Sequence, residues 1–230
     1  MDSARIPAFL LRLLWLPVVA LPVWYSSTTP VAFADTPAEA ADEALVRNTF
    51  REYKSAILQA RGETAVRQVS SHTIDYYQQM KDLALKGTPA HVHGLKLMDR
   101  LMVLSLRHRM TLQQLQDLSA PELFSFAVDQ GWIGKESVER LEIGAISING
   151  DAAKGEYIFD GKAAPLHFSF YREQGEWRFD LLPVLNTGNA ALEEALKREG
   201  TDENEFILSA MESVTGKKPA PTIWDPLLPQ

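Results

Sequence analysis

The fold is decided by the stretch Phe168-Ser169-Phe170-Tyr171-Arg172-Glu173-Gln174-Gly175-Glu176-Trp177-Arg178-Phe179-Asp180-Leu181. On both sides of Gln174-Gly175, large apolar residues alternate with polar ones. Successive side chains of a β-strand point to opposite faces, so this alternation predicts two antiparallel strands, 163–172 and 176–183, joined by a tight turn. The same alternation predicts earlier strands at 138–148 and 152–159, with turns at 149–151 and 160–161. The sequence therefore predicts a meander of four strands.

The alternation also predicts one buried face and one hydrated face of the sheet. The apolar residues that share a parity within their strands are Tyr157, Phe159, Leu166, Phe168, Phe170, Trp177, Phe179 and Leu181. The opposite parity carries Lys154, Glu156, His167, Ser169, Tyr171, Arg178 and Asp180. An antiparallel sheet commonly packs one face on the core and leaves the other in water. We therefore expect an aromatic inner face and a hydrated outer face, although the outer row of Glu156, His167, Arg178 and Asp180 could also support a homodimer through the sheet.

Apolar residues with helical spacing flank the predicted sheet in the sequence. Before the sheet, we expect helices at 38–60, 63–68 and 71–87, a buried helix that begins at Thr88-Pro89 and includes 95–106, and a helix from the capping box Ser119-Ala120-Pro121-Glu122 to Gly131. After the sheet, we expect helices at 190–199 and 202–215. The predicted fold class is α+β, with N-terminal helices packed on a curved antiparallel sheet and with extra helices.

The C-terminal segment 217–230 differs from the rest of the chain in composition. It contains Pro219, Pro221, Pro226 and Pro229. Proline lacks the backbone N–H that helices and central strands need, so we expect an extended Pro-rich tail without regular structure. Its apolar residues Ile223, Trp224 and Leu227 could still pack on the domain.

Residues 1–34 have the pattern of a secretory signal peptide. Arg5 and Arg12 precede the apolar run 13–25. Ala32-Phe33-Ala34 then supplies the small residues that a signal peptidase requires. The run is shorter than a membrane-spanning helix and is interrupted by proline, which favours cleavage over a retained anchor. We expect a signal peptide at 1–34, a single domain at 35–216 and the tail at 217–230, located in the periplasm or secreted, with no stable membrane span after processing.

Composition narrows the classes of function. The 230-residue chain is 46% hydrophobic and 23% charged, which is typical of a globular protein. It has no cysteine, which excludes disulfides and thiolate catalysis and is more typical of a periplasmic protein than of a small secreted scaffold. Its formal net charge is -7, with no basic cluster, so a nucleic-acid partner is disfavoured.

Two segments resemble a known superfamily. The hairpin Ile148-Asn149-Gly150-Asp151-Ala152-Ala153-Lys154-Gly155 and the 168–181 stretch, with its hydrophobic strand, glycine turn and Trp-Arg-x-Asp sequence, resemble the nuclear transport factor 2-like superfamily of cystatin-like cones. The resemblance covers the first helices and residues 138–183, but not the helical stretch 88–131 or the tail. It implies an exported bacterial member in which the sheet curls around the helices and the mouth of the cone holds a small apolar ligand. Members include isomerases, cyclases and binding modules, so the fold alone does not define a function.

We expect the inner face to contribute to an apolar pocket, because its aromatic residues carry no readily titrated group. The residues predicted to bind a ligand are Tyr76, Tyr77, Trp132, Tyr157, Phe168 and Trp177. The favoured function is an exported, non-enzymatic cone that binds a small apolar ligand or a partner protein of the cell envelope. No cofactor is expected.

The alternative is an enzyme of the ketosteroid-isomerase or polyketide-cyclase type. The resemblance implies a carboxylate base inside the cone with tyrosine donors opposite, and Asp75 beside Tyr76 and Tyr77 is the weak candidate for that arrangement. The inner face lacks the expected Asp, which weighs against catalysis. A further alternative is a tether in an envelope assembly, with the tail and residues 95–106 as contact surfaces.

A metal site is not expected. His91 and His93 are two residues apart on a predicted helix, so their side chains point in different directions, and no third ligand has a zinc-like spacing.

Overall fold

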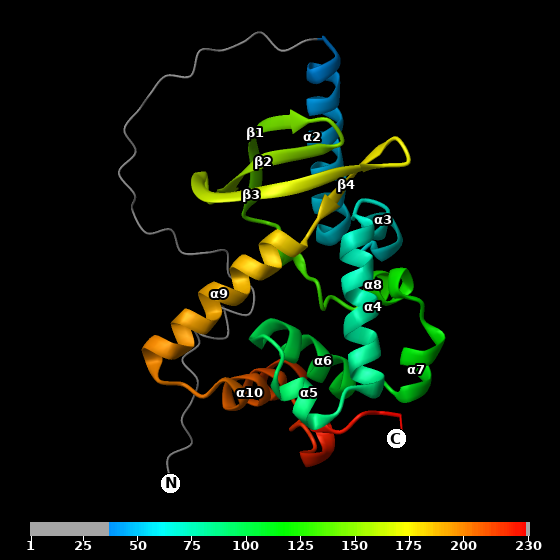
Figure 1. Ribbon diagram of the computed structural model, residues 1–230, viewed down its shortest axis with the longest axis vertical. Coiled ribbons are helices and arrows are strands. Elements are labelled where there is room, and N and C mark those ends of the chain that lie inside the picture. The colour runs from blue at the N-terminus through cyan, green and yellow to red at the C-terminus, as the bar shows by residue number, and fades with distance from the viewer. Residues whose placement is uncertain (1–36, 229–230) are drawn as a thin grey trace.

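The computed structural model describes residues 37–228 (Figure 1). The predicted signal peptide, 1–34, lies outside these residues. The described part of the chain has nine α-helices and one four-stranded antiparallel sheet, which confirms the predicted α+β class. None of the helices within residues 37–228 is long and apolar enough to cross a membrane.

The sheet is the predicted meander. It consists of β1 (Leu141–Asn149), β2 (Ala152–Phe159), β3 (Lys162–Glu173) and β4 (Glu176–Asp180), and the strands are neighbours in chain order. Gly150, Gly161 and Gly175 adopt positive φ in the three turns, where other residues are strained. The β1–β2 and β2–β3 ladders each contain a register shift, and such irregularities bend a sheet.

Helix α2 (Pro37–Leu58) covers the inner face of the sheet (Figure 1). The ring of Phe50 lies 4.7 Å from that of Phe168, and the ring of Tyr53 lies 5.1 Å from that of Phe179. The inner-face residues Tyr157, Phe168, Phe170, Trp177 and Phe179 are buried, which confirms this part of the predicted face. Phe159, Leu166 and Leu181 are only half-buried.

The outer face differs from the expectation at one residue. Asp180 is buried, although the alternation predicted it in water. Its Oδ1 accepts hydrogen bonds from the Thr73 hydroxyl (3.3 Å) and from the Leu182 N–H (3.1 Å). A buried carboxylate needs such donors, and Leu182 begins the next helix, so Asp180 ends the strand and starts helix α9 (Leu182–Glu199).

That junction corrects two predicted boundaries. Strand β4 ends at Asp180 rather than at 183, and α9 begins at Leu182 rather than at 190. Pro183 in the first turn of α9 explains the early start, because proline is favoured where no intrahelical N–H bond is needed. At the other end of the sheet, β1 begins at Leu141 rather than at 138, after the short 3-10 helix η1 (Lys135–Ser137).

A second layer of helices joins the sheet to the rest of the molecule. It consists of α3 (Gly62–Val66), α4 (Ser71–Lys86) and α8 (Ala120–Asp129). The N–H of Gly62 donates to Asp129 Oδ1 at 2.6 Å, and a Cβ on Gly62 would lie 2.1 Å from the Ser125 carbonyl oxygen, so only glycine allows this close approach. The capping box predicted at Ser119 and Glu122 is present.

The remaining helices form the lower part of the view in Figure 1: α5 (Pro89–His93), α6 (Leu97–Arg109), α7 (Leu112–Asp117) and α10 (Glu203–Thr215), with α9 leading to α10 from the sheet. The single helix predicted from Thr88 through 106 is wrong, because the chain breaks at Gly94 into α5 and α6. Helix α7 was not predicted. Its capping box, in which Thr111 and Gln114 bond each other's backbone, was a signal in the sequence.

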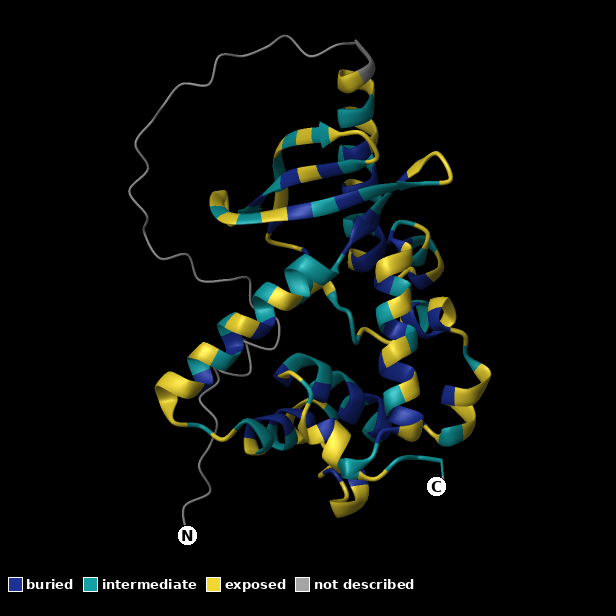
Figure 2. Cartoon of the chain, viewed as in Figure 1, coloured by how far each residue is buried: buried dark blue, intermediate teal, exposed yellow. Residues whose placement is uncertain are grey.

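The tail packs against this helical part. It contains the 3-10 helix η2 (Pro221–Trp224), where no regular structure was expected. Ile223 is buried, and the ring of Trp224 stacks on that of His93 at 4.0 Å. The buried Arg107 guanidinium donates to the carbonyls of Ile223 (3.3 Å) and Trp224 (2.7 Å), so a side chain of α6 holds the tail. Figure 2 shows buried residues along α6 and α10 and a mixture of buried and exposed residues on α9.

Candidate cavity between the sheet and the helices

A cavity of about 330 Å³ lies where the inner face of the sheet meets the helical part. Ligand pockets in proteins begin at about this size. Its walls come from α2, α4, α6, α8, the segment from Gln130 to Arg140, strands β1, β2, β3 and β4, and helices α9 and α10. The cavity therefore forms only when both parts of the molecule come together.

Five of the six residues predicted to bind a ligand line this cavity: Tyr76, Tyr77, Trp132, Tyr157 and Phe168. They come from α4, the loop after α8, β2 and β3. The sixth, Trp177, does not line it. Its ring lies 4.4 Å from the Arg172 guanidinium carbon, and its Nε1–H donates to Asp42 at 3.4 Å, so Trp177 joins β4 to the start of α2 instead.

One face of α6 supplies lining residues that were not predicted. Met98, Leu101, Met102, Ser105 and Arg109 all border the cavity. Their spacing of three, four and seven residues places them on one stripe of a helix. The sequence showed α6 as apolar nearly all round, and nothing in it distinguished this stripe from the stripe that packs on α4. Leu185 of α9 and Met211 and Val214 of α10 complete the wall.

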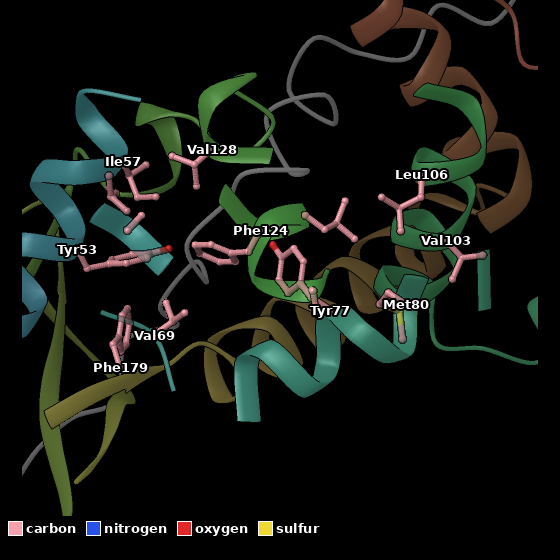
Figure 3. Close-up of a cluster of buried hydrophobic side chains, with 14 of the residues drawn as sticks. Tyr53, Ile57, Val69, Tyr77, Met80, Val103, Leu106, Phe124, Val128 and Phe179 are labelled. Atoms are coloured by element: carbon pink, nitrogen blue, oxygen red, sulfur yellow. The ribbon is translucent and has the colours of Figure 1, made fainter. Parts of the chain in front are cut away.

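A continuous buried cluster borders the cavity (Figure 3), and Tyr53, Tyr77, Leu106 and Phe179 belong to both. It runs from Phe179 and Tyr53 on the side of the sheet, through Phe124 and Tyr77, to Val103 and Leu106 on α6. The rings of Tyr77 and Phe124 meet edge to face, with centroids 5.0 Å apart. Dense packing in this cluster holds the side chains of α4 that line the cavity in place.

Tyrosine hydroxyls are the main polar groups of the interior wall. Within residues 37–228, the hydroxyls of Tyr53, Tyr77 and Tyr157 have no hydrogen-bond partner. Burial raises the pKa of all three, that of Tyr157 to about 12. They are therefore neutral at ordinary pH and can each donate or accept one hydrogen bond to a ligand.

Tyr76 differs from the other tyrosines because its hydroxyl donates to Asp99 Oδ1 at 2.9 Å. Burial, and then the negative charge of Asp99, raises its pKa. This hydrogen bond holds the Tyr76 ring at the cavity wall. The Tyr76 hydroxyl proton is therefore not free to bind a ligand.

The carboxylate of the catalytic alternative is not at the cavity. Asp75 is exposed and is not among the lining residues, although its neighbours Tyr76 and Tyr77 are. The lining residue that carries a carboxyl group is Glu136, and it too is exposed. The three side chains do not converge as that alternative requires.

The histidines of the helical part do not come together as metal ligands would. His91 is exposed, and His93 stacks on Trp224. His108 Nε2 lies 2.9 Å from the Thr215 hydroxyl, which joins α6 to the end of α10. The described residues contain no group of three or more His, Cys, Asp or Glu side chains that could hold a metal ion.

Comparison of the chain with protein-family models, curated proteins and solved structures found no match.

Proposed function

We propose that this protein is an exported, non-enzymatic domain that binds a small apolar ligand in the cavity between the sheet and the helical part. The observation that carries the proposal is the cavity itself, about 330 Å³ in volume and walled by aromatic, methionine and leucine side chains. This half-open apolar space has a volume at the lower end of the range of ligand pockets. Removing apolar ligand surface from water provides the free energy for binding.

The few polar groups support binding rather than proton transfer. The unpaired hydroxyls of Tyr53, Tyr77 and Tyr157 are neutral donors, which orient a ligand without reacting with it. A proton-transfer enzyme needs a shielded carboxylate near its substrate. Asp75 and Glu136 are exposed, and the half-buried Asp99 does not line the cavity and accepts the hydrogen bond of Tyr76. Flexible methionines on α6 and α10 suit ligands of variable shape.

A cone of the nuclear transport factor 2-like kind is part of this proposal. It is supported by α2 lying across a curved meander, and by the apolar space next to the inner face. Export is supported by the sequence of residues 1–34 alone. Helices α6, α9 and α10 supply further walls of that space.

Binding of N-phenyl-1-naphthylamine, a neutral fluorescent probe, tests the proposal. Leu101→Trp places a large ring in the cavity from the wall formed by α6, and we expect it to weaken binding at least about tenfold while the circular dichroism spectrum is retained. The control is Leu45→Trp, which adds the same ring at a position that is 52% exposed and remote from the cavity. Equal binding by Leu101→Trp and Leu45→Trp would contradict the proposal.

A further inference from the structure

One half-buried charged side chain in the described cavity wall makes no hydrogen bond or ion pair. Arg109, the last residue of α6, is half-buried and lines the cavity. Within residues 37–228, its guanidinium makes no hydrogen bond, and no carboxylate lies within 4.0 Å of it. The guanidinium instead lies over the ring of Trp132, with its central carbon 4.9 Å from the ring centroid.

The other arginines show that this is unusual within the molecule. Every other described arginine that is buried or half-buried donates to an acceptor in the protein: Arg47, Arg100, Arg107, Arg172 and Arg178. A second arginine of the cavity wall, Arg140, is exposed and forms an ion pair with Asp160. Of the two arginines of the described wall, Arg109 is the one that makes no hydrogen bond.

The Arg109 guanidinium is only partly withdrawn from water, so its N–H groups stay accessible to a ligand in the cavity. Burial lowers the pKa of Arg109, although the group stays charged at ordinary pH. His108 precedes it and Lys217 lies close to His108, whereas the carboxyl-bearing residue of the wall, Glu136, is exposed and forms no ion pair with Arg109. Stacking on Trp132 instead holds the guanidinium plane beside the apolar space.

We propose that the ligand of this cavity is a single-chain amphiphile with a carboxylate head, such as a fatty acid, and that Arg109 binds the carboxylate. This inference rests on the proposed function, because it names the chemical class of the apolar ligand. The planar guanidinium presents two parallel N–H donors that match the two oxygens of a carboxylate. The chain then lies along Met98, Leu101 and Met102, which are successive turns of the same face of α6.

The test compares decanoate with decanol as competitors of N-phenyl-1-naphthylamine. The two have the same chain, so their difference measures the head group. A charge-assisted hydrogen bond in a partly desolvated site predicts that decanoate binds about 10- to 100-fold more tightly than decanol. Arg109→Gln should remove most of this preference by weakening decanoate and leaving decanol unchanged, and Arg109→Lys should retain part of it.

Arg198→Gln is the matched control, since Arg198 is an exposed arginine of α9 that is not among the residues lining the cavity. We expect it to leave the preference for decanoate unchanged. Arg109 has no hydrogen bond to lose, so Arg109→Gln should fold with an unchanged circular dichroism spectrum. If decanol binds as tightly as decanoate, or if Arg109→Gln weakens both equally, the inference is wrong and the proposed function stands. If the naphthylamine, decanol and decanoate all fail to bind the unmodified protein, the proposed function itself is wrong.

Discussion

The sheet and the helical part of this protein are held together by different chemistry. In the sheet, aromatic rings of β2, β3 and β4 pack against each other and against rings of α2. The ring of Phe168, for example, lies within 5.5 Å of the rings of Phe50, Tyr157 and Phe179. In the helical part, the buried guanidinium of Arg107 joins backbone carbonyls of segments far apart in sequence. The cavity lies between the two, with aromatic rings on one wall and flexible side chains of α6 and α10 on the other.

This difference indicates that the wall formed by the sheet is rigid and that the wall formed by α6 and α10 can adapt to a ligand. Rings in a dense cluster have few alternative positions, because each is surrounded by others. Methionine and leucine side chains on a helix that faces a cavity have several. We therefore expect a ligand to be shaped by the wall of the sheet and accommodated by the wall of the helices.

The largest expected effect on stability comes from the sheet. Phe168 is fully buried, and Phe168→Ala removes its ring from contact with three others. We expect a loss of about 4 kcal/mol in the free energy of unfolding, measured by urea denaturation, because the ring is lost and a void remains. The control Leu45→Ala, at an exposed position of α2, should change it by no more than about 0.5 kcal/mol. Similar losses for both variants would show that the aromatic cluster does not stabilise the sheet.

The next effect tests the polar framework of the helical part. Arg107 donates to the carbonyls of Leu83 (3.0 Å), Ala84 (3.0 Å) and Gly87 (2.6 Å) at the end of α4, as well as to the tail. Arg107→Met leaves the carbonyls of Ala84 and Gly87 without this donor, while the carbonyl of Leu83 keeps the N–H of Gly87, so we expect a loss of about 3 kcal/mol in the free energy of unfolding. Arg198→Met, on the exposed surface of α9, is the control.

Hydrogen exchange locates the effect of that substitution. The N–H of Leu228 donates to the carbonyl of Leu85 at 2.9 Å, so this amide should be protected in the unmodified protein and exchange faster in Arg107→Met. Unchanged protection at Leu228 would mean that the tail is held without Arg107.

The smallest expected effect is on the stability of the protein at acidic pH. The hydrogen bond from Arg172 to Asp42 lowers the pKa of that carboxyl below its ordinary value of 3.8, and the hydrogen bond from Trp177 lowers it further. A carboxyl whose pKa is lower in the folded state stabilises the protein above its unfolded pKa, and this stabilisation is lost as the pH falls through the folded value. We therefore expect the Asp42 carbon signal to titrate below 3.8 in NMR, and Asp42→Asn to make stability less sensitive to acid. A midpoint at or above 3.8 would contradict the ion pair.

The sheet could be predicted from the sequence far better than the site. A period of two fixes the face of every residue once one strand is placed, so Tyr157, Phe168 and Phe179 were assigned correctly from alternation. Asp180 escaped that rule because its burial depends on Thr73, which is remote in sequence and meets it only in the folded chain.

The wall formed by α6 could not be predicted for the same kind of reason. A helix that is apolar nearly all round has several equivalent stripes, and only the packing of α4, α9 and α10 decides that the stripe with Leu101 and Arg109 faces a cavity. The missing partner of Arg109 is likewise a property of the folded molecule, because acidic residues are plentiful in the sequence.

Our main conclusion is that the space between the sheet and the helical part is a binding site. A crystal structure of the protein in complex with a brominated naphthalene is its most direct test. We expect an anomalous bromine signal between α6 and the inner face of the sheet, in contact with Leu101 and Tyr157, with the rings of the sheet unmoved. A cavity filled by the protein's own side chains, with bromine bound only at the surface, would contradict it.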